Sequence, residues 1–256
     1  MRSFVAFFKK ELLESIRSSK ILLLGILFVA FGIMNPAIAK LTPWMLEVMA
    51  DQLAESGMTV TAVTVDALTS WTQFFKNIPM ALMVFVFVYS SIFTKEYESE
   101  TLVLIFTKGL ARYKVLLAKT ILTLGLWSAG YWLCFGITYG YNAYFWDNSI
   151  AAELMPAVVN WWLFGMFTVA LMMVFSVLSR SYLGVLLGTG GVIAASYAAG
   201  LVPKAAKYVP TSLMNSAKLL VGAEKASDYA VTLVITVVLT VFCIAVSIPV
   251  FNKKQI

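Results

Sequence analysis

The chain has 256 residues, of which 61% are hydrophobic and 12% charged, and its mean hydropathy is +0.86. Because soluble domains carry about 25% charged residues, this composition excludes an ordinary soluble domain and indicates an integral membrane protein. The sequence contains no histidine, which excludes a histidine-based catalytic triad and a histidine-ligated metal. Cys134 and Cys243 both lie in apolar runs and indicate neither a disulfide framework nor a metal site.

The first predicted element is an interfacial elbow helix over residues 2–18. Four apolar residues recur there at every fourth position and form one ridge, opposite charged side chains: Phe4, Phe8, Leu12 and Ile16. This pattern is typical of a helix that lies along a membrane surface.

The charge-free run 21–39 follows and predicts the first transmembrane helix. Its end, Ala37–Ala39, resembles a signal-peptidase site, but the charged region before it is too long and too regularly patterned for a signal peptide. Residues 40–76 form a polar interval, which we expect on the outer side of the membrane.

Five later runs are also long enough to span a bilayer. We predict a single all-α domain over 1–256 with six transmembrane helices. The five further helices are expected at 77–94, 113–140, 154–179, 181–203 and 229–251.

The distribution of lysine and arginine predicts the orientation. If the N-terminus is inside, most of the 19 basic residues fall on the inner side, as the positive-inside rule requires. Both termini and the segment 95–112 are then cytoplasmic. The net charge of +6 is explained by this bias, so it is no sign of nucleic-acid binding.

The segment 95–112 is charged at both ends around the apolar run Leu102–Phe106, which is too short to span a membrane. It is either a docking helix for a soluble partner or an amphipathic connection that rests on lipid headgroups. On a helix, Leu102, Ile105 and Phe106 would share one face.

Two glycine pairs have the spacing of small-residue helix contacts: Gly136 with Gly140, and Gly184 with Gly188. They indicate close packing within the chain or a contact between two copies. Gly188–Gly191 is rich in glycine, but no lysine follows it, so it is not a phosphate-binding loop.

The cores of the predicted spans contain no Asp, Glu, Lys, Arg or His. Ion-coupled carriers usually keep such residues in the membrane, so their absence argues against ion coupling, although backbone carbonyls could still hold sodium. Because the chain also lacks a nucleotide-binding motif, the energy for uphill transport would come from a partner.

Several segments resemble the permease subunit of an ABC-2 type transporter. The resemblance rests on the helix FFKKELLESIRSSK before the first span, on SWTQFFKN at 70–77, and on E-x-x-x-x-T-L from Glu96 to Leu102 with the basic stretch up to Lys119. Two positions depart from the family pattern: Glu100 stands where a glycine is usual, and Gly109 where a proline is usual.

The resemblance implies a bacterial cytoplasmic-membrane exporter in which two permeases, identical or paralogous, pair above two ATPase subunits. ATP and Mg²⁺ would bind to those subunits, and this chain would hold no cofactor, metal or catalytic residue. Similar permeases serve exporters of amphipathic or antimicrobial peptides such as phenol-soluble modulins and bacitracin, and others are linked to sodium or lipid-linked glycans. The segment after the second span would be the coupling helix, with Glu96, Glu98, Leu102, Ile105, Phe106 and Arg112 toward the ATPase.

By the same resemblance, the second and fifth helices line the substrate path, with Phe85, Phe87, Tyr89 and Tyr197 as candidates. Two alternatives stay open: an ion-coupled carrier or channel without an ATPase, and a membrane anchor or sensor that transports nothing. The sequence names no substrate and decides neither the direction of transport nor between a homodimer and a heterodimer.

Overall fold

The computed structural model describes residues 2–48, 65–98, 101–107 and 109–254, which are helical and contain no strand. Among them are six helices long and apolar enough to cross a membrane, so the predicted class of a helical multi-pass membrane protein is confirmed. These helices are α2 (Lys20–Val48), α4 (Ala67–Tyr89), α7 (Arg112–Phe145), α8 (Leu154–Leu178), α9 (Tyr182–Gly200) and α11 (Ala230–Lys253).

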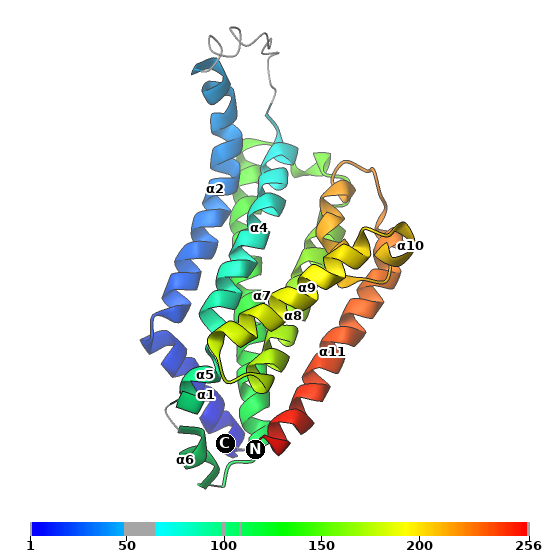
Figure 1. The fold of residues 1–256 in the computed structure, drawn as a ribbon. Coiled ribbons are helices and arrows are strands. Elements are labelled where there is room, and N and C mark those ends of the chain that lie inside the picture. The colour runs from blue at the N-terminus through cyan, green and yellow to red at the C-terminus, as the bar shows by residue number, and fades with distance from the viewer. Residues whose placement is uncertain (1, 49–64, 99–100, 108, 255–256) are drawn as a thin grey trace.

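The two chain termini lie at the same end of the bundle, here called the basal end (Figure 1). This end also holds the short helices α1 (Arg2–Arg17), α5 (Thr94–Glu98) and α6 (Thr101–Thr107). The opposite end holds η1 (Asn148–Ile150), α10 (Pro203–Ala206), η2 (Pro210–Leu219) and η3 (Ala226–Tyr229).

Two helices are longer than the sequence predicted. Helix α2 continues past residue 39 to Val48, with Pro36 and Pro43 inside it, since prolines are tolerated in membrane helices where neighbouring groups replace the lost hydrogen bond. Helix α4 begins ahead of residue 77, after Asp66, whose carboxylate accepts a hydrogen bond from the Thr69 amide at 2.9 Å. The predicted outer interval 40–76 is therefore partly helical, and its residues 49–64 lie outside the described part of the chain.

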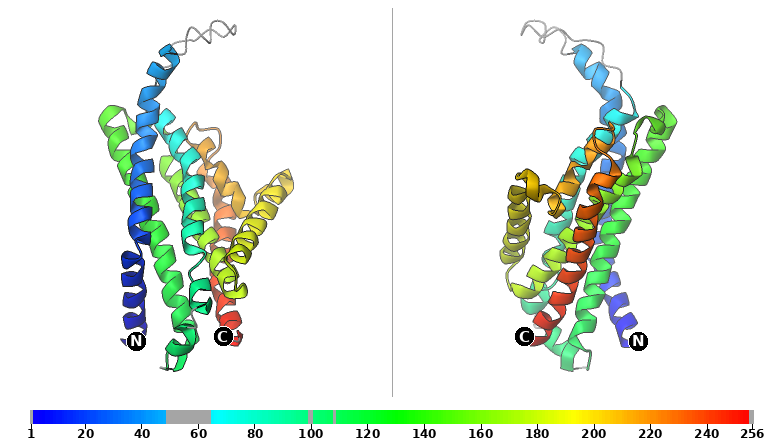
Figure 2. Two further views of the ribbon diagram at one scale, coloured as in Figure 1. Left: turned by 60° about the vertical axis from the view of Figure 1, so that its left-hand side comes forward. Right: turned by 90° about the vertical axis from the view of Figure 1, so that its right-hand side faces the viewer.

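The helices are packed unevenly. Helix α7 packs against α2, α4 and α8, and α8 also contacts α9, α11 and η2. Helix α9 is mostly exposed and leans away from the bundle, as the left view of Figure 2 shows. The side formed by α9 and α11 is therefore more open than the side formed by α2, α4 and α7.

A chain of polar side chains joins three of the spans. The Asn77 amide donates to Asn35 Oδ1 at 2.7 Å, and the Asn35 amide donates to the Thr138 hydroxyl at 3.1 Å. Thr138 in turn donates to the carbonyl of Gly32 at 3.0 Å. Because these buried polar groups satisfy one another, they hold α4, α2 and α7 in register.

The close contacts of glycines agree only in part with the sequence prediction. A Cβ atom at Gly165 would lie 2.2 Å from the Trp127 indole, whereas one at Gly136 or Gly140 would meet nothing within 4 Å. The predicted packing role is thus wrong for Gly136 and Gly140 within this chain, because no neighbour approaches them. Gly188 does pack closely, against the ring of Phe175, and Gly184 lies against the Ser179 hydroxyl.

Candidate functional site

Five charged residues from three helices meet at the basal end and are called the basal charge cluster: Lys10, Glu11 and Glu14 of α1, Glu96 of α5 and Lys119 of α7. Lys119 Nζ lies 2.6 Å from Glu11 Oε2 and 3.1 Å from Glu96 Oε1. Lys10 Nζ lies within 4 Å of all three carboxylates. The cluster therefore joins the first helix of the chain to the segment after α4 and to a candidate span.

The centre of the cluster is buried. The side chains of Lys119, Glu11 and Glu96 are 3%, 6% and 9% exposed. Lys119 lies inside α7, toward the start of the helix at Arg112 and outside the charge-free core predicted for this span. A buried charge without a partner costs several kcal/mol, and the ion pairs offset part of that cost here because each charge has an opposite one beside it.

The acidic groups of the cluster differ in their affinity for protons. Burial raises the pKa of Glu96, and the nearby Glu11 carboxylate adds to the rise, while Lys119 and Lys10 act against it. The two Glu96 oxygens accept no well-aligned hydrogen bond from the described residues. The more exposed Glu14 has a lowered pKa, chiefly because Lys10 donates a hydrogen bond to it. Glu96 is thus easier to protonate than Glu14.

The buried face of α1 is not the predicted apolar ridge. Phe7, Glu11 and Ser15 are buried, whereas Ile16 of the ridge is 52% exposed. The ion pair of Glu11 with Lys119 holds the face with Phe7, Glu11 and Ser15 toward the protein, and Phe4 and Phe8 of the ridge pack at the edge of the core.

The predicted docking face of the coupling segment also points inward. Leu102 is fully buried, and the Phe106 ring packs at 6.2 Å from that of Phe251 at the end of α11. Ile105 is partly buried against the same core. Leu102 is therefore not free to enter a partner, since the chain's own helices already cover it. The outward side of α6 carries Val103, which is 39% exposed.

Two basic side chains hold the ends of helices at the basal end. Arg112 donates to the carbonyls of Phe251, Asn252 and Lys254. Lys254 donates to the carbonyls that end α8, those of Val177, Leu178 and Ser179. Cations at helix C-termini satisfy the free carbonyls and complement the helix dipole. Arg112, predicted to face the ATPase, thus ties the start of α7 to the end of α11.

Three residues of the family-like segment cannot be placed in this network. The side chain of Glu98 lies outside the described part of the structure, and so do Glu100 and Lys108.

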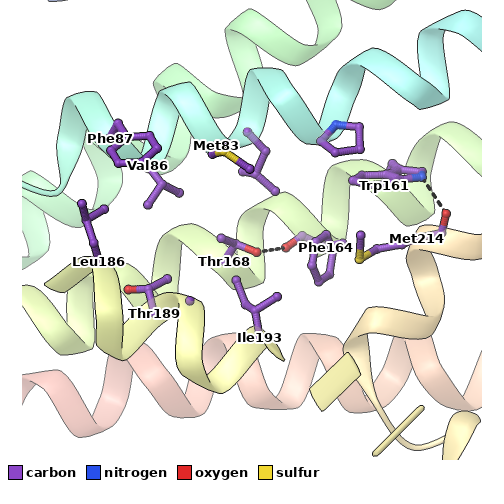
Figure 3. Close-up of a pocket in the computed structure, with 13 residues that line it drawn as sticks. Met83, Val86, Phe87, Trp161, Phe164, Thr168, Leu186, Thr189, Ile193 and Met214 are labelled. Atoms are coloured by element: carbon purple, nitrogen blue, oxygen red, sulfur yellow. Dashed lines mark hydrogen bonds between the residues drawn. The ribbon is translucent and has the colours of Figure 1, made fainter. Parts of the chain in front are cut away.

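A cavity of about 320 Å³ lies between α4, α8 and α9, with η2 at one end. Figure 3 shows its lining side chains converging from these elements, and we call it the α4–α8–α9 cavity. Its walls are formed by Pro79, Leu82, Met83, Val86, Phe87, Trp161, Phe164, Thr168, Leu186, Thr189, Gly190, Ile193 and Met214.

The polar side-chain groups of this lining are already engaged. Thr168 donates to the Phe164 carbonyl at 3.0 Å and Thr189 to the Val185 carbonyl at 2.8 Å, each within its own helix. The Trp161 indole donates to the Met214 carbonyl at 3.2 Å (Figure 3). The cavity therefore offers apolar surface and no unused side-chain donor.

The four residues predicted to line a substrate path lie in different surroundings in the structure. Phe87 lines the cavity and is 47% exposed. Phe85 and Tyr89 are buried and stack on each other at 5.0 Å, so in this conformation they pack the core instead of facing a substrate. Tyr197 is exposed on α9 but is not among the lining residues. Sequence reasoning missed Met83 and the residues from α8, because nothing in a charge-free run shows which face meets another helix.

The chain matches no protein-family model, no curated protein and no solved structure. Its chemistry therefore has to be inferred from its own residues. In the described residues, no group of three or more His, Cys, Asp and Glu side chains could hold a metal ion. The basal charge cluster can act as a joint between helices, and the α4–α8–α9 cavity can hold an apolar group.

Proposed function

We propose that the chain is the membrane-spanning permease subunit of an ATP-binding cassette exporter. It would move an amphipathic or hydrophobic substrate, with peptides as the first class to test, out of a bacterial cell. ATP and Mg²⁺ would be used by a separate ATPase subunit. The proposal is supported by the six candidate spans and by the family-like segment from Glu96 to Lys119.

The observation that carries the proposal is the basal charge cluster. It joins Glu96, the first residue of the family-like motif, to Lys119 inside a candidate span. A force applied to α5 and α6 would reach α7 through this ion pair, because separating buried partners leaves uncompensated charges. The geometry suits a subunit that receives movement from a partner below the membrane.

The partner would bind the outward side of α6, on which Val103 is exposed. In the proposed orientation, the basal end with both termini is cytoplasmic, as the distribution of basic residues predicts. The exposed apolar side chains of α9 and α11, such as Leu187 and Val234, would face lipid or a second permease.

Co-purification tests the proposal. The tagged chain is isolated in mild detergent from its own cells, and the ATPase subunit is quantified. Val103→Asp should reduce recovery of that subunit about tenfold, a change of about 1.4 kcal/mol in binding free energy, because it adds a charge to an apolar contact. Val221→Asp is the control, since Val221 is exposed and lies in the turn between η2 and η3, away from α6. Equal recovery from both variants would contradict the proposed docking side.

One observation favours a second candidate, a proton-coupled carrier. Glu96 is a buried carboxyl group with a raised pKa beside a candidate span, and it borders a polar cavity of about 80 Å³. Ionisable groups at such places often relay protons. Transport driven by a pH gradient in vesicles that contain only this chain would support the carrier.

A third candidate, an anchor or sensor, would leave the ATPase rate unchanged with every substrate tried.

A further inference from the structure

The α4–α8–α9 cavity opens at the depth of the bilayer. Met83 and Phe87 of α4 line it and are 59% and 47% exposed, and Gly190 of α9 is also exposed. All three lie inside candidate spans, so the surroundings at this opening are hydrocarbon. Anything that enters from the side comes from the apolar layer of the membrane.

The chemistry of the walls selects the kind of occupant. A peptide backbone brings N–H and C=O groups, which must be hydrogen-bonded when they leave water. The hydroxyls of Thr168 and Thr189 and the indole of Trp161 already donate elsewhere. A hydrocarbon tail has no polar groups, so it can fill this apolar space without leaving a hydrogen bond unmade.

The cavity is open at the side and has a volume of about 320 Å³. Its apolar walls would hold water poorly, so we expect an apolar group to fill it in the membrane. Lipid tails are the apolar molecules present at this depth.

We propose that the α4–α8–α9 cavity binds the hydrocarbon tail of a bilayer lipid, which enters sideways between α4 and α9. The inference deepens the proposed function, because it names the tail as the part of a transported amphiphile that this chain holds. In that respect the inference rests on the proposed function. Binding itself needs neither ATP nor a partner. A failure of the exporter proposal would therefore leave the binding result unaffected.

Two neighbouring glycines of α9 provide matched variants. Gly190 lines the cavity and Gly191 does not, and a Cβ atom at either would meet nothing within 4 Å. Gly190→Phe should place a ring in the cavity, whereas Gly191→Phe adds the same ring on the same helix outside it. Any general effect of phenylalanine on α9 is thus shared by both variants.

The experiment uses the full chain in phosphatidylcholine vesicles whose acyl chains carry a photoactivatable diazirine. After illumination, labelled residues are located by mass spectrometry. We expect labelling near Met83 and Phe87 in the wild type and in Gly191→Phe, and about tenfold less in Gly190→Phe. Labelling of Val234 and Val238, exposed on α11, should be the same in all three proteins and reports ordinary lipid contact.

Two results would overturn the inference. One is equal labelling near Met83 and Phe87 in Gly190→Phe and Gly191→Phe, which would mean that lipid only coats the outside of α4. The other comes from an amphipathic peptide with a diazirine side chain added to unlabelled vesicles. If the peptide labels the cavity walls in the wild type and lipid does not, the occupant is a peptide.

Discussion

At the basal end, each buried charge has an opposite charge beside it, whereas in the α4–α8–α9 cavity the polar side chains are engaged and the open space is apolar. Lys119 depends on two partners from helices far apart in sequence, Glu11 and Glu96. Phe87 and Met83, by contrast, border a space that the protein leaves unfilled. The first region should therefore tolerate almost no substitution, and the second should tolerate many with little loss of stability.

The largest expected effect is that of Lys119→Met. It leaves Glu11 and Glu96 with only the half-exposed Lys10 beside them, and breaking a buried ion pair in this way costs about 3–5 kcal/mol. The melting temperature of the detergent-solubilised protein, measured by intrinsic fluorescence, should fall clearly.

The control for this prediction neutralises the whole centre of the cluster. Adding Glu11→Gln and Glu96→Gln to Lys119→Met removes the unpaired charges and should restore most of the lost stability. If Lys119→Met alone is as stable as the wild type, the cluster is not a buried joint between the helices.

A smaller effect is expected where two helices touch. Gly165→Ala puts a methyl group 2.2 Å from the Trp127 indole, and overpacking of this kind costs about 1–3 kcal/mol. Gly136→Ala is the matched change on α7, where the methyl group meets nothing within 4 Å. If both variants melt at the same temperature, the close contact of α7 with α8 is wrong.

Glu96 should give the basal end a dependence on pH. Its pKa is raised above the ordinary value of 4.5 by burial, with Lys119, Lys10 and Glu11 facing it. Between the ordinary pKa of Glu96 in the unfolded chain and its raised pKa in the folded protein, the folded protein holds a proton that the unfolded chain has lost. Stability should therefore fall as pH rises through this range. In melting curves taken from pH 4.5 upward, Glu96→Gln should remove this slope. A slope that stays in the variant would assign it to another group.

The smallest effect is expected in the cavity. Gly190→Ala adds a methyl group to open space, and alanine is a better helix former by about 1 kcal/mol or less. The melting temperature should stay the same or rise slightly. A clear fall would mean that the cavity is closed by a contact which the methyl group disturbs.

The architecture followed from composition because long charge-free runs leave few alternatives in a bilayer. The ends of the helices were less predictable. Lys76 bounds the charge-free run that predicted the second span, yet α4 continues on both sides of it. The first span was predicted to end at residue 39, but α2 continues through Pro43 to Val48. Local sequence rules do not show which neighbours support a helix across a proline or a charge.

The candidate sites were predictable only in part. The segment after the second span was singled out correctly as unusual in its charges, but the partners of Glu96 were not predicted. Glu11 and Lys119 are far apart in sequence, and no periodic pattern links them. The apolar face with Leu102 was expected to point outward and is covered by the chain itself. Phe87 was predicted to face a substrate path and does line the cavity, while Phe85 packs the core.

The central claim is that a separate subunit supplies the energy. It is tested most directly by comparing ATP hydrolysis of the chain purified together with its partners and of the chain purified alone. The tagged protein is isolated in mild detergent from membranes in which partners have first been cross-linked. We expect a second protein with a phosphate-binding loop in the eluate and hydrolysis that requires Mg²⁺. The chain expressed and purified alone should hydrolyse no ATP. An eluate that contains no ATPase and shows no hydrolysis, despite the cross-linking, would contradict the account.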